Sequence, residues 1–206
     1  MFSETTMISI LAAVGASYLI GAIPLAAVVS RMRGVDIFAI GTGLPGAANV
    51  LRNVGYMEGG LVFWGDVLKG WVSIIVAYRI GVSDGFILIP AFATLFGHWR
   101  SIFTRFKGGD GLSPLVGMTI AILPVYGLIA TFTGLTVAAI ASKAGRHASI
   151  WGGIAAYGFI LIRAPFMEFS NILPVGVVVL ALLVFAHGFK GHRKRRIEAN
   201  ASKYRS

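Results

Sequence analysis

Long apolar runs alternate along most of this chain with short segments that are basic or rich in glycine. Runs at residues 7–30, 59–78 and 85–104 are each long enough for a helix that crosses a bilayer, which needs about 20 residues. Two further runs lie at residues 149–162 and 172–185. This pattern predicts an all-α integral membrane protein.

The uncharged stretch at residues 112–142 is much longer than one crossing needs. It is either one tilted helix, giving six crossings, or two short helices that turn near Pro124, giving seven. Seven crossings place nearly all basic residues on one side of the membrane, whereas six scatter them over both sides. The positive-inside rule therefore favours seven transmembrane helices, with the N-terminus outside and the C-terminus cytoplasmic. The outside loops are then residues 79–84, 124–127 and 163–171.

Composition and charge agree with a membrane protein. The chain is 56% hydrophobic and 13% charged, whereas a soluble domain is about one-quarter charged. A net charge of +10 would suggest nucleic acid in a soluble protein. Here the cations lie at the ends of apolar runs, so we expect no nucleic-acid partner and contacts with membrane lipids instead. We divide the chain into a membrane domain, residues 1–188, and a basic cytoplasmic tail, residues 189–206.

The first segment with candidate chemistry is the glycine-rich stretch of residues 34–52. Closely spaced glycines let backbone N–H groups converge on an anion, and two polar side chains could add donors. Two interpretations stay open, a phosphate-binding loop and a simple turn that ends in a basic residue. The candidate phosphate ligands in this segment are Gly41, Thr42, Gly43, Asn49 and Arg52.

The second segment, residues 97–111, combines a histidine with basic residues around a glycine turn. A histidine within a membrane run is costly unless it has a role. The segment is either a second phosphate site or a basic loop between two helices. Its candidate residues are His98, Lys107, Gly108 and Gly109.

Other charged groups have simpler interpretations. Asp66 and Lys69 are three residues apart on one predicted helix and are expected to form a structural ion pair. The basic cluster at residues 190–196 is expected to orient the protein and to meet anionic lipids. The sequence contains no cysteine and no metal-ligand spacing, so we expect neither a metal site nor a cofactor.

Four motifs together resemble the bacterial acyl-phosphate-dependent glycerol-3-phosphate acyltransferases, small inner-membrane enzymes of phospholipid biosynthesis. Residues 41–52 resemble the family pattern G-S-G-N-x-G-A-T-N-x-x-R. Residues 18–24 resemble Y-L-x-G-S-I-P, and residues 66–70 match D-x-x-K-G. Residues 97–111 resemble G-H-x-x-P-x-F-x-x-F-K-G-G-K-G. The four motifs keep the family order over roughly residues 17–117.

The resemblance implies seven transmembrane helices and a cytoplasmic active site at the cell inner membrane. It implies that the enzyme transfers an acyl group from acyl phosphate to the 1-hydroxyl of glycerol 3-phosphate. In these terms His98 and Lys107 are catalytic. The residues that bind the substrate phosphates are Gly41, Thr42, Gly43, Asn49, Arg52, Gly108, Gly109 and His187.

Several positions depart from the family patterns. Each lost charge-assisted hydrogen bond is worth about 1.5–3 kcal/mol, so the losses support an alternative function. In this alternative the chain is a catalytically degenerate member that serves as a structural or lipid-binding subunit among other membrane protein subunits. A transporter is a third hypothesis, but the sequence lacks the paired broken helices expected of one. The departures are Leu44, Ala48, Asp110, Lys190 and the family serine, which falls at Arg146, His147 or Ser149.

Overall fold

Helices account for the regular structure in the computed structural model, which describes residues 6–144, 148–167 and 172–203. Two short 3₁₀ helices, Ile102–Thr104 and Ala164–Phe166, accompany the α-helices. The prediction of an all-α fold is confirmed. The α-helices are α1 Met7–Ala22, α2 Leu25–Met32, α3 Ala47–Asn53, α4 Tyr56–Arg79, α5 Leu88–Trp99, α6 Leu112–Ile122, α7 Pro124–Ala144, α8 Ala148–Arg163 and α9 Ile172–Lys203.

Within the described residues, 5 helical segments are long and apolar enough to cross a membrane. Helices α5 and α6 are apolar but span only 12 and 11 residues. The length of these two helices is below the number of residues that one full crossing takes. The crossing segments are Met7–Met32, Tyr56–Arg79, Pro124–Lys143, Ala148–Phe166 and Ile172–Phe189.

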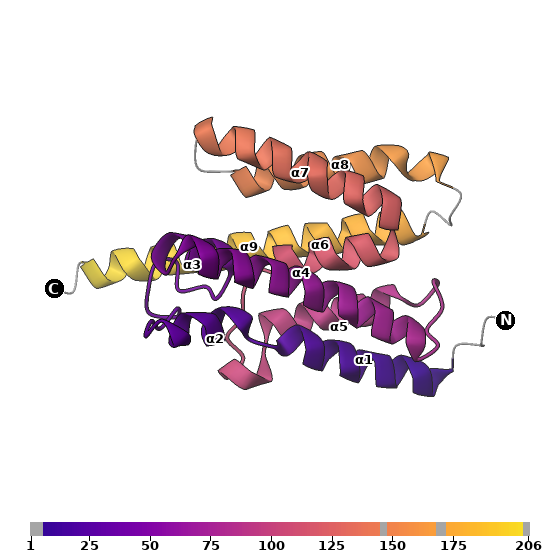
Figure 1. Ribbon diagram of the computed structural model, residues 1–206, viewed down its shortest axis with the longest axis horizontal. Coiled ribbons are helices and arrows are strands. Elements are labelled where there is room, and N and C mark those ends of the chain that lie inside the picture. Colours follow the sequence, from indigo (N-terminus) through magenta and orange to yellow (C-terminus); the bar gives the residue numbers. More distant parts are fainter. Residues whose placement is uncertain (1–5, 145–147, 168–171, 204–206) are drawn as a thin grey trace.

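The long uncharged stretch is divided into α6 and α7, as the charge distribution favoured. The two helices meet at Leu123 and fold back on each other (Figure 1). Residues 124–127 were expected as an outside loop, and this boundary was wrong because they form the first turn of α7. Proline is well tolerated there, since the first turn of a helix needs no backbone donor at that position.

The first apolar run is broken between α1 and α2 at Ile23 and Pro24. Proline has no N–H to donate, and its ring disfavours a helical conformation at the preceding residue. The break leaves backbone carbonyls near the end of α1 without helical partners, and these carbonyls become part of the site described below.

Close helix packing builds the half of the bundle that carries the site. A Cβ atom on Gly21 or Gly97 would overlap the backbone of the facing helix in the α1–α5 pair. Gly70 and Gly117 play the same part between α4 and α6. Backbones that approach this closely are typical of membrane helices with small residues at their interfaces. Figure 1 shows α7 and α8 as a separate layer above this half.

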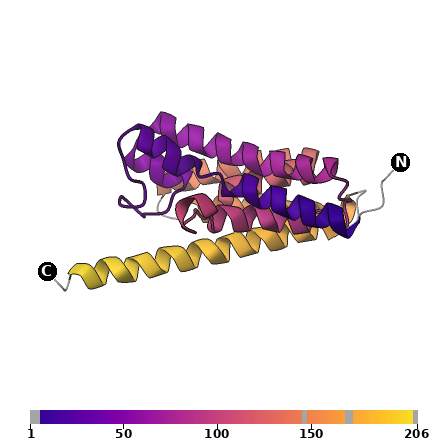
Figure 2. The ribbon, with the colours of Figure 1, turned by 90° about the horizontal axis from the view of Figure 1, so that it is seen from below.

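Helix α9 extends past the end of the bundle (Figure 2). The expected boundary between the membrane domain and the tail, at residue 188, lies inside this helix. Helix α1 begins at one end of the bundle and α9 finishes at the opposite end (Figure 1). The site lies at the end where α9 projects.

Candidate functional site

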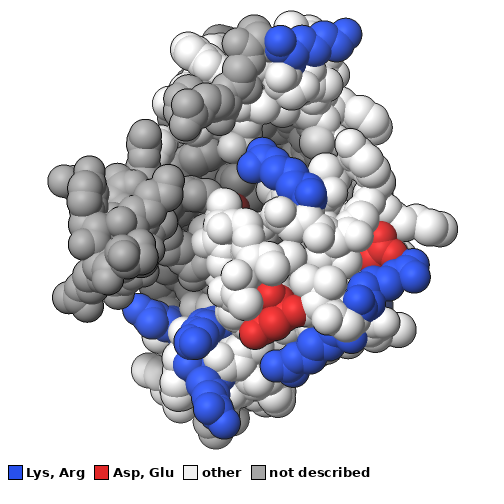
Figure 3. All heavy atoms as spheres, turned by 90° about the vertical axis from the view of Figure 1, so that its left-hand side faces the viewer, with Lys and Arg blue, Asp and Glu red and all other residues white. Residues whose placement is uncertain are grey.

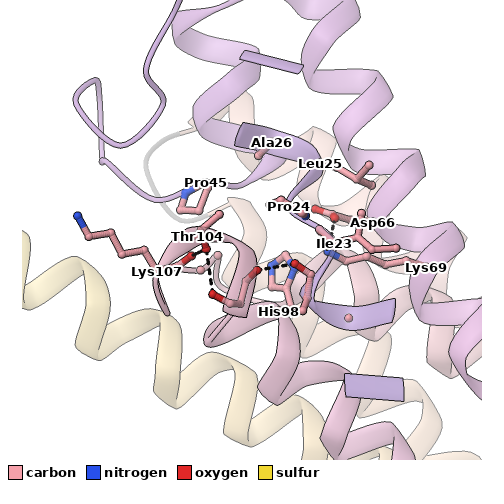
Figure 4. Close-up of a pocket in the computed structure, with 15 residues that line it drawn as sticks. Ile23, Pro24, Leu25, Ala26, Pro45, Asp66, Lys69, His98, Thr104 and Lys107 are labelled. Atoms are coloured by element: carbon pink, nitrogen blue, oxygen red, sulfur yellow. Dashed lines mark hydrogen bonds and ion pairs between the residues drawn. The ribbon is translucent and has the colours of Figure 1, made fainter. Parts of the chain in front are cut away.

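A pocket with about 260 Å³ of empty space lies beside the break between α1 and α2. The break itself, the second candidate segment and α4 contribute its walls (Figure 4). The lining residues are Gly21, Ala22, Ile23, Pro24, Leu25, Ala26, Pro45, Asp66, Lys69, His98, Ser101, Thr104, Lys107, Gly108 and Gly109.

Asp66 and Lys69 form one wall of the pocket. Lys69 Nζ lies 2.8 Å from Asp66 Oδ1, and the two side chains are almost completely buried. Lys69 Nζ also donates to the carbonyl of Ile23 at 3.0 Å. The expected ion pair is therefore present, and it additionally holds the broken end of α1 against α4. It brings a fixed buried cation to the pocket.

Residues 100–107 form a hook that follows α5 and is attached to α1. Ser101 Oγ donates to the carbonyl of Ala22 at 2.5 Å, and Phe106 N donates to the carbonyl of Ser101 at 2.8 Å. Arg105 and Phe106 have φ values of 53° and 61°. This left-handed backbone is unfavourable for residues other than glycine, so the hydrogen bonds are needed to hold the hook.

Gly108 and Gly109 pass directly over His98, which is buried. Gly109 N donates to the carbonyl of His98 at 3.2 Å. A Cβ atom on Gly108 would overlap the carbonyl of His98, and one on Gly109 would lie 2.5 Å from His98 Nε2. Only glycine fits this approach, which explains the Gly-Gly pair and places the imidazole at the pocket wall.

Lys107 lies at the mouth of the pocket. Its side chain points away from His98 and from the buried ion pair (Figure 4). Its Nζ lies over the ring of Phe38, 6.0 Å from the ring centroid. Such a contact is a weak cation–π interaction at an exposed position, so the ammonium group is available to an anion that enters from solvent.

Asn49 is buried and holds the glycine-rich segment together. Its Nδ2 donates to the carbonyls of Ile37, Ile40 and Leu44 at 3.0–3.3 Å. Its Oδ1 accepts from Thr42 N at 3.2 Å and from the amide of a neighbouring asparagine. These bonds occupy its hydrogen-bonding groups, so in this structure Asn49 shapes the loop.

The other candidates of the glycine-rich segment lie outside the lining of the pocket. Gly41 and Gly43 have φ values of 56° and 60°, which a turn here requires. Thr42 Oγ1 accepts a hydrogen bond from Leu44 N at 3.4 Å. Arg52 is exposed on α3. The structure thus brings His98, Lys107, Gly108 and Gly109 together at the pocket. The candidates Gly41, Thr42, Gly43 and Arg52 are not part of its lining.

His187 on α9 lies against Trp99 of α5. Its ring stacks on the indole with centroids 4.5 Å apart and an interplanar angle of 15°. Trp99 Nε1 donates to the carbonyl of Asp110 at 2.8 Å. The Asp110 carboxylate accepts from Leu112 N at 3.2 Å, which satisfies a donor at the start of α6. Asp110 therefore has a local structural role where the family pattern has lysine.

For the other positions that depart from the family patterns, the structure gives at most the exposure of the side chain. Leu44 is half-buried and Ala48 is exposed, and Ser149 is exposed on α8. Arg146, His147 and the side chain of Lys190 lie outside what the structure describes.

Sequence analysis missed several pocket residues. Asp66 and Lys69 were interpreted only as a structural pair, although charges within a membrane run are a signal of function. Ser101, Thr104 and Pro45 also line the pocket. Ser and Thr next to a basic loop carry no distinctive spacing, and only the fold brings Pro45 to the same place.

Positive charge is concentrated at the site end of the molecule. Figure 3 shows Lys and Arg side chains spread over this end, with few acidic ones among them. Such a surface attracts anionic ligands. In the part of the chain that the structure describes, Glu58 is paired with Arg33 at 2.5 Å and Asp66 with Lys69 at 2.8 Å.

Residues 11–197 match the family model described as glycerol-3-phosphate acyltransferase. The chain belongs to the glycerol-3-phosphate acyltransferase family. A glycerol-3-phosphate acyltransferase of Dechloromonas aromatica is 39% identical over 142 residues, covering 68% of this chain and 70% of the relative. One from Thermus thermophilus is 34% identical over 170 residues, covering 82% of each. The family expected from the four motifs is confirmed.

The fold agrees with a solved structure of the glycerol-3-phosphate acyltransferase family. The crystal structure of PlsY (YgiH), an integral membrane glycerol 3-phosphate acyltransferase, in its glycerol 3-phosphate form matches with a TM-score of 0.73. The two sequences are 29% identical, and the match covers 94% of this chain and 93% of the other. Together with its apolar helices, this match identifies the chain as an integral membrane protein with several membrane-crossing helices.

Proposed function

We propose that this protein transfers an acyl group from acyl phosphate to the 1-hydroxyl of glycerol 3-phosphate. The observation that carries the proposal is the pocket in which His98 lies under the Gly108–Gly109 turn, beside the buried cation of Lys69. Two anionic substrates must be held together for this reaction, and a basic pocket with glycine amides meets that requirement. Membership of the glycerol-3-phosphate acyltransferase family supports the same activity.

In the proposed reaction the 1-hydroxyl oxygen of glycerol 3-phosphate attacks the acyl carbonyl carbon. The bond between that carbon and the phosphate oxygen breaks, and inorganic phosphate leaves. The other product is lysophosphatidate. The hydroxyl proton goes to the imidazole of His98 and then to the departing phosphate, which is the role of a general base.

The phosphate groups are held by cations and backbone amides in this proposal. Gly109 N already donates to His98, whereas Gly108 N has no partner among the described residues. In this proposal Gly108 N therefore donates a hydrogen bond to a substrate phosphate. Lys107 moves from Phe38 to the entering anion. Arg52, Gly41, Thr42, Gly43 and His187 complete the phosphate contacts from the neighbouring loop and α9.

Lys69, the lysine of the family motif D-x-x-K-G, supplies a fixed cation to the pocket in this proposal. Its Nζ lies in the pocket wall and is fixed by Asp66 and the Ile23 carbonyl. A preorganised charge stabilises developing negative charge without the cost of reorganisation. This arrangement, together with the family match, argues against the alternative of a degenerate subunit, and the proposal needs no further membrane protein subunit.

The proposed membrane orientation has seven crossings, an outside N-terminus and a cytoplasmic site in the cell inner membrane. The start of α1 and the finish of α9 lie at opposite ends of the bundle, which supports an odd number of crossings. The positive site end supports a cytoplasmic location. The basic tail, residues 189–206, then lies on the same side, and it is helical as far as Lys203.

The decisive experiment is acyl transfer by purified protein in lipid, with acyl phosphate and radiolabelled glycerol 3-phosphate. Wild type is expected to form lysophosphatidate, and His98→Ala is expected to lose this activity. Arg79→Gln, a change of an exposed arginine at the opposite end of α4, is the matched control and should keep it. If wild type forms no lysophosphatidate under conditions in which a related family enzyme does, the proposal is wrong.

A further inference from the structure

The hook of residues 100–107 presents an apolar outer face. Ile102, Phe103 and Phe106 are 53%, 60% and 55% exposed, although they lie within five residues of one another. In Figure 1 the hook projects from the end of α5 beside the junction of α1 and α2. A contiguous exposed apolar patch on an ordered element marks an interaction surface.

Cations alternate with these apolar side chains. Arg100 and Arg105 are exposed, and neither forms an ion pair with an acidic residue in the part of the chain that the structure describes. An acidic protein or a nucleic acid would satisfy the arginines but leave three large apolar side chains in water. An acidic phospholipid offers both an anionic headgroup and an acyl region, so it complements the whole surface.

The hook lies at a depth where such lipids are found. Tyr18 Oη donates to the carbonyl of Arg100 at 3.0 Å, and Ser101 is bonded to Ala22. Ala22 is fifteen residues after the start of α1 at Met7. The rise of a helix places it about 22 Å from that start, within a hydrocarbon core of about 30 Å. From this depth an arginine side chain reaches the headgroups by snorkelling.

We propose that the hook binds acidic phospholipids in the leaflet at the site end of the molecule. Ile102, Phe103 and Phe106 insert among the acyl chains, and Arg100 and Arg105 bind the headgroups. The chain continues directly from the hook into the Gly108–Gly109 turn over His98. A bound lipid therefore fixes this wall of the pocket and increases acyl transfer. The binding is independent of the proposed function, whereas the increase in rate rests on it.

The depth of the hook in the bilayer is measured with a spin label on an introduced cysteine. The chain has no cysteine, so Phe103→Cys creates a single labelling position, and Ile102→Cys supplies a second. Phe132→Cys on α7 is the lipid-exposed control, and Ala39→Cys in the glycine-rich loop is the water-exposed control. Labels at 102 and 103 should be reached by oxygen and shielded from a water-soluble nickel chelate, as at 132. Accessibility to the nickel chelate equal to that at 39 would overturn the proposal.

Lipid selectivity is measured with protein in nanodiscs of phosphatidylcholine alone or of an equimolar mixture with phosphatidylglycerol. Native mass spectrometry should show phosphatidylglycerol enriched on the wild type. The enrichment should fall about fivefold in Arg100→Gln and about fivefold in Arg105→Gln. Arg79→Gln is the matched control and should keep the enrichment. Equal retention of both lipids by wild type would overturn the proposal even if the enzyme is fully active.

The rate is compared in the same two kinds of nanodisc. Wild type should transfer acyl groups several-fold faster with phosphatidylglycerol present, and the double variant Arg100→Gln, Arg105→Gln should lose this difference. Enrichment of lipid without any effect on rate would overturn the coupling. Absence of acyl transfer in both kinds of disc would instead count against the proposed function, because the spin-label and mass measurements need no activity.

Discussion

Lys69 on α4 donates to the carbonyl of Ile23 at the break between α1 and α2, with 3.0 Å between nitrogen and oxygen. The same ammonium group is paired with Asp66 at 2.8 Å. One buried cation thus joins the broken helix to α4 and faces the pocket. An uncompensated charge in this position would be costly, so the fold of the site end depends on all three groups.

Replacement of Lys69 by methionine should destabilise the protein strongly. It leaves the Asp66 carboxylate buried without its cation and removes the donor to Ile23, and loss of one partner of a buried pair costs about 3–5 kcal/mol. The double variant Asp66→Asn, Lys69→Met should recover part of that loss. Thermal unfolding in detergent measures both. A single variant as stable as wild type would show that the pair contributes little.

Asn49 and Arg52 lie close together on α3, but replacement of Asn49 should lower stability, whereas replacement of Arg52 should lower activity. Asn49→Ala removes four hydrogen bonds to the glycine-rich loop and one to Asn53 on α3. At a net value of about 0.5–1.5 kcal/mol for each bond, and with water replacing some of them, we expect a loss of about 2–4 kcal/mol in stability. Thermal unfolding measures this loss, and an unchanged unfolding temperature would contradict the structural role of Asn49.

Arg52→Ala should leave the unfolding temperature unchanged, because the side chain is exposed on α3. Its kcat/KM should fall about tenfold to a hundredfold if Arg52 binds a substrate phosphate, since a charge-assisted hydrogen bond is lost. Radiolabelled acyl transfer and unfolding are measured on the same preparations. A large loss of stability in Arg52→Ala would mean that the residue is structural.

The sequence predicted the membrane fold well because apolar runs and the placement of cations report directly on the bilayer. It favoured a division of residues 112–142, which the structure shows at Leu123. It did not give the start of α7 correctly, because Pro124 was interpreted as a loop residue and not as the first residue of a helix.

The site was less accessible to sequence analysis. His98, Lys107 and the two glycines are close in sequence, and the structure places them at one pocket. The role of Lys69 depends on the carbonyl of Ile23, which is 46 residues away in sequence. The position of Asn49 inside the loop also depends on contacts that no spacing reveals. The contact between Lys69 and Ile23 arises only from the packing of α1 against α4.

Trp99 should position His187 through the stacking of their rings. Trp99→Leu removes the stacking surface, whose worth of about 0.5–1.5 kcal/mol corresponds to a roughly threefold to tenfold rise in KM for glycerol 3-phosphate. Trp99→Phe keeps a ring and should recover most of the affinity, although it loses the bond to Asp110. Steady-state kinetics with both substrates varied provide the measurement. Equal KM values for the leucine variant and wild type would exclude this role.

Asp110 allows a test of whether this site needs the family lysine. Its carboxylate accepts from Leu112 N at the start of α6, and Asp110→Asn keeps that acceptor. Asp110→Lys removes it, so we expect a loss of about 1 kcal/mol in stability, typical of one lost hydrogen bond. Because Lys69 already supplies a cation in the pocket, Asp110→Lys should lower kcat/KM or leave it unchanged, with Asp110→Asn close to wild type. Acyl-transfer rates and unfolding temperatures of the two variants decide the matter. A clear gain in activity with lysine at this position would show that Lys69 alone does not meet the need of the site for a cation.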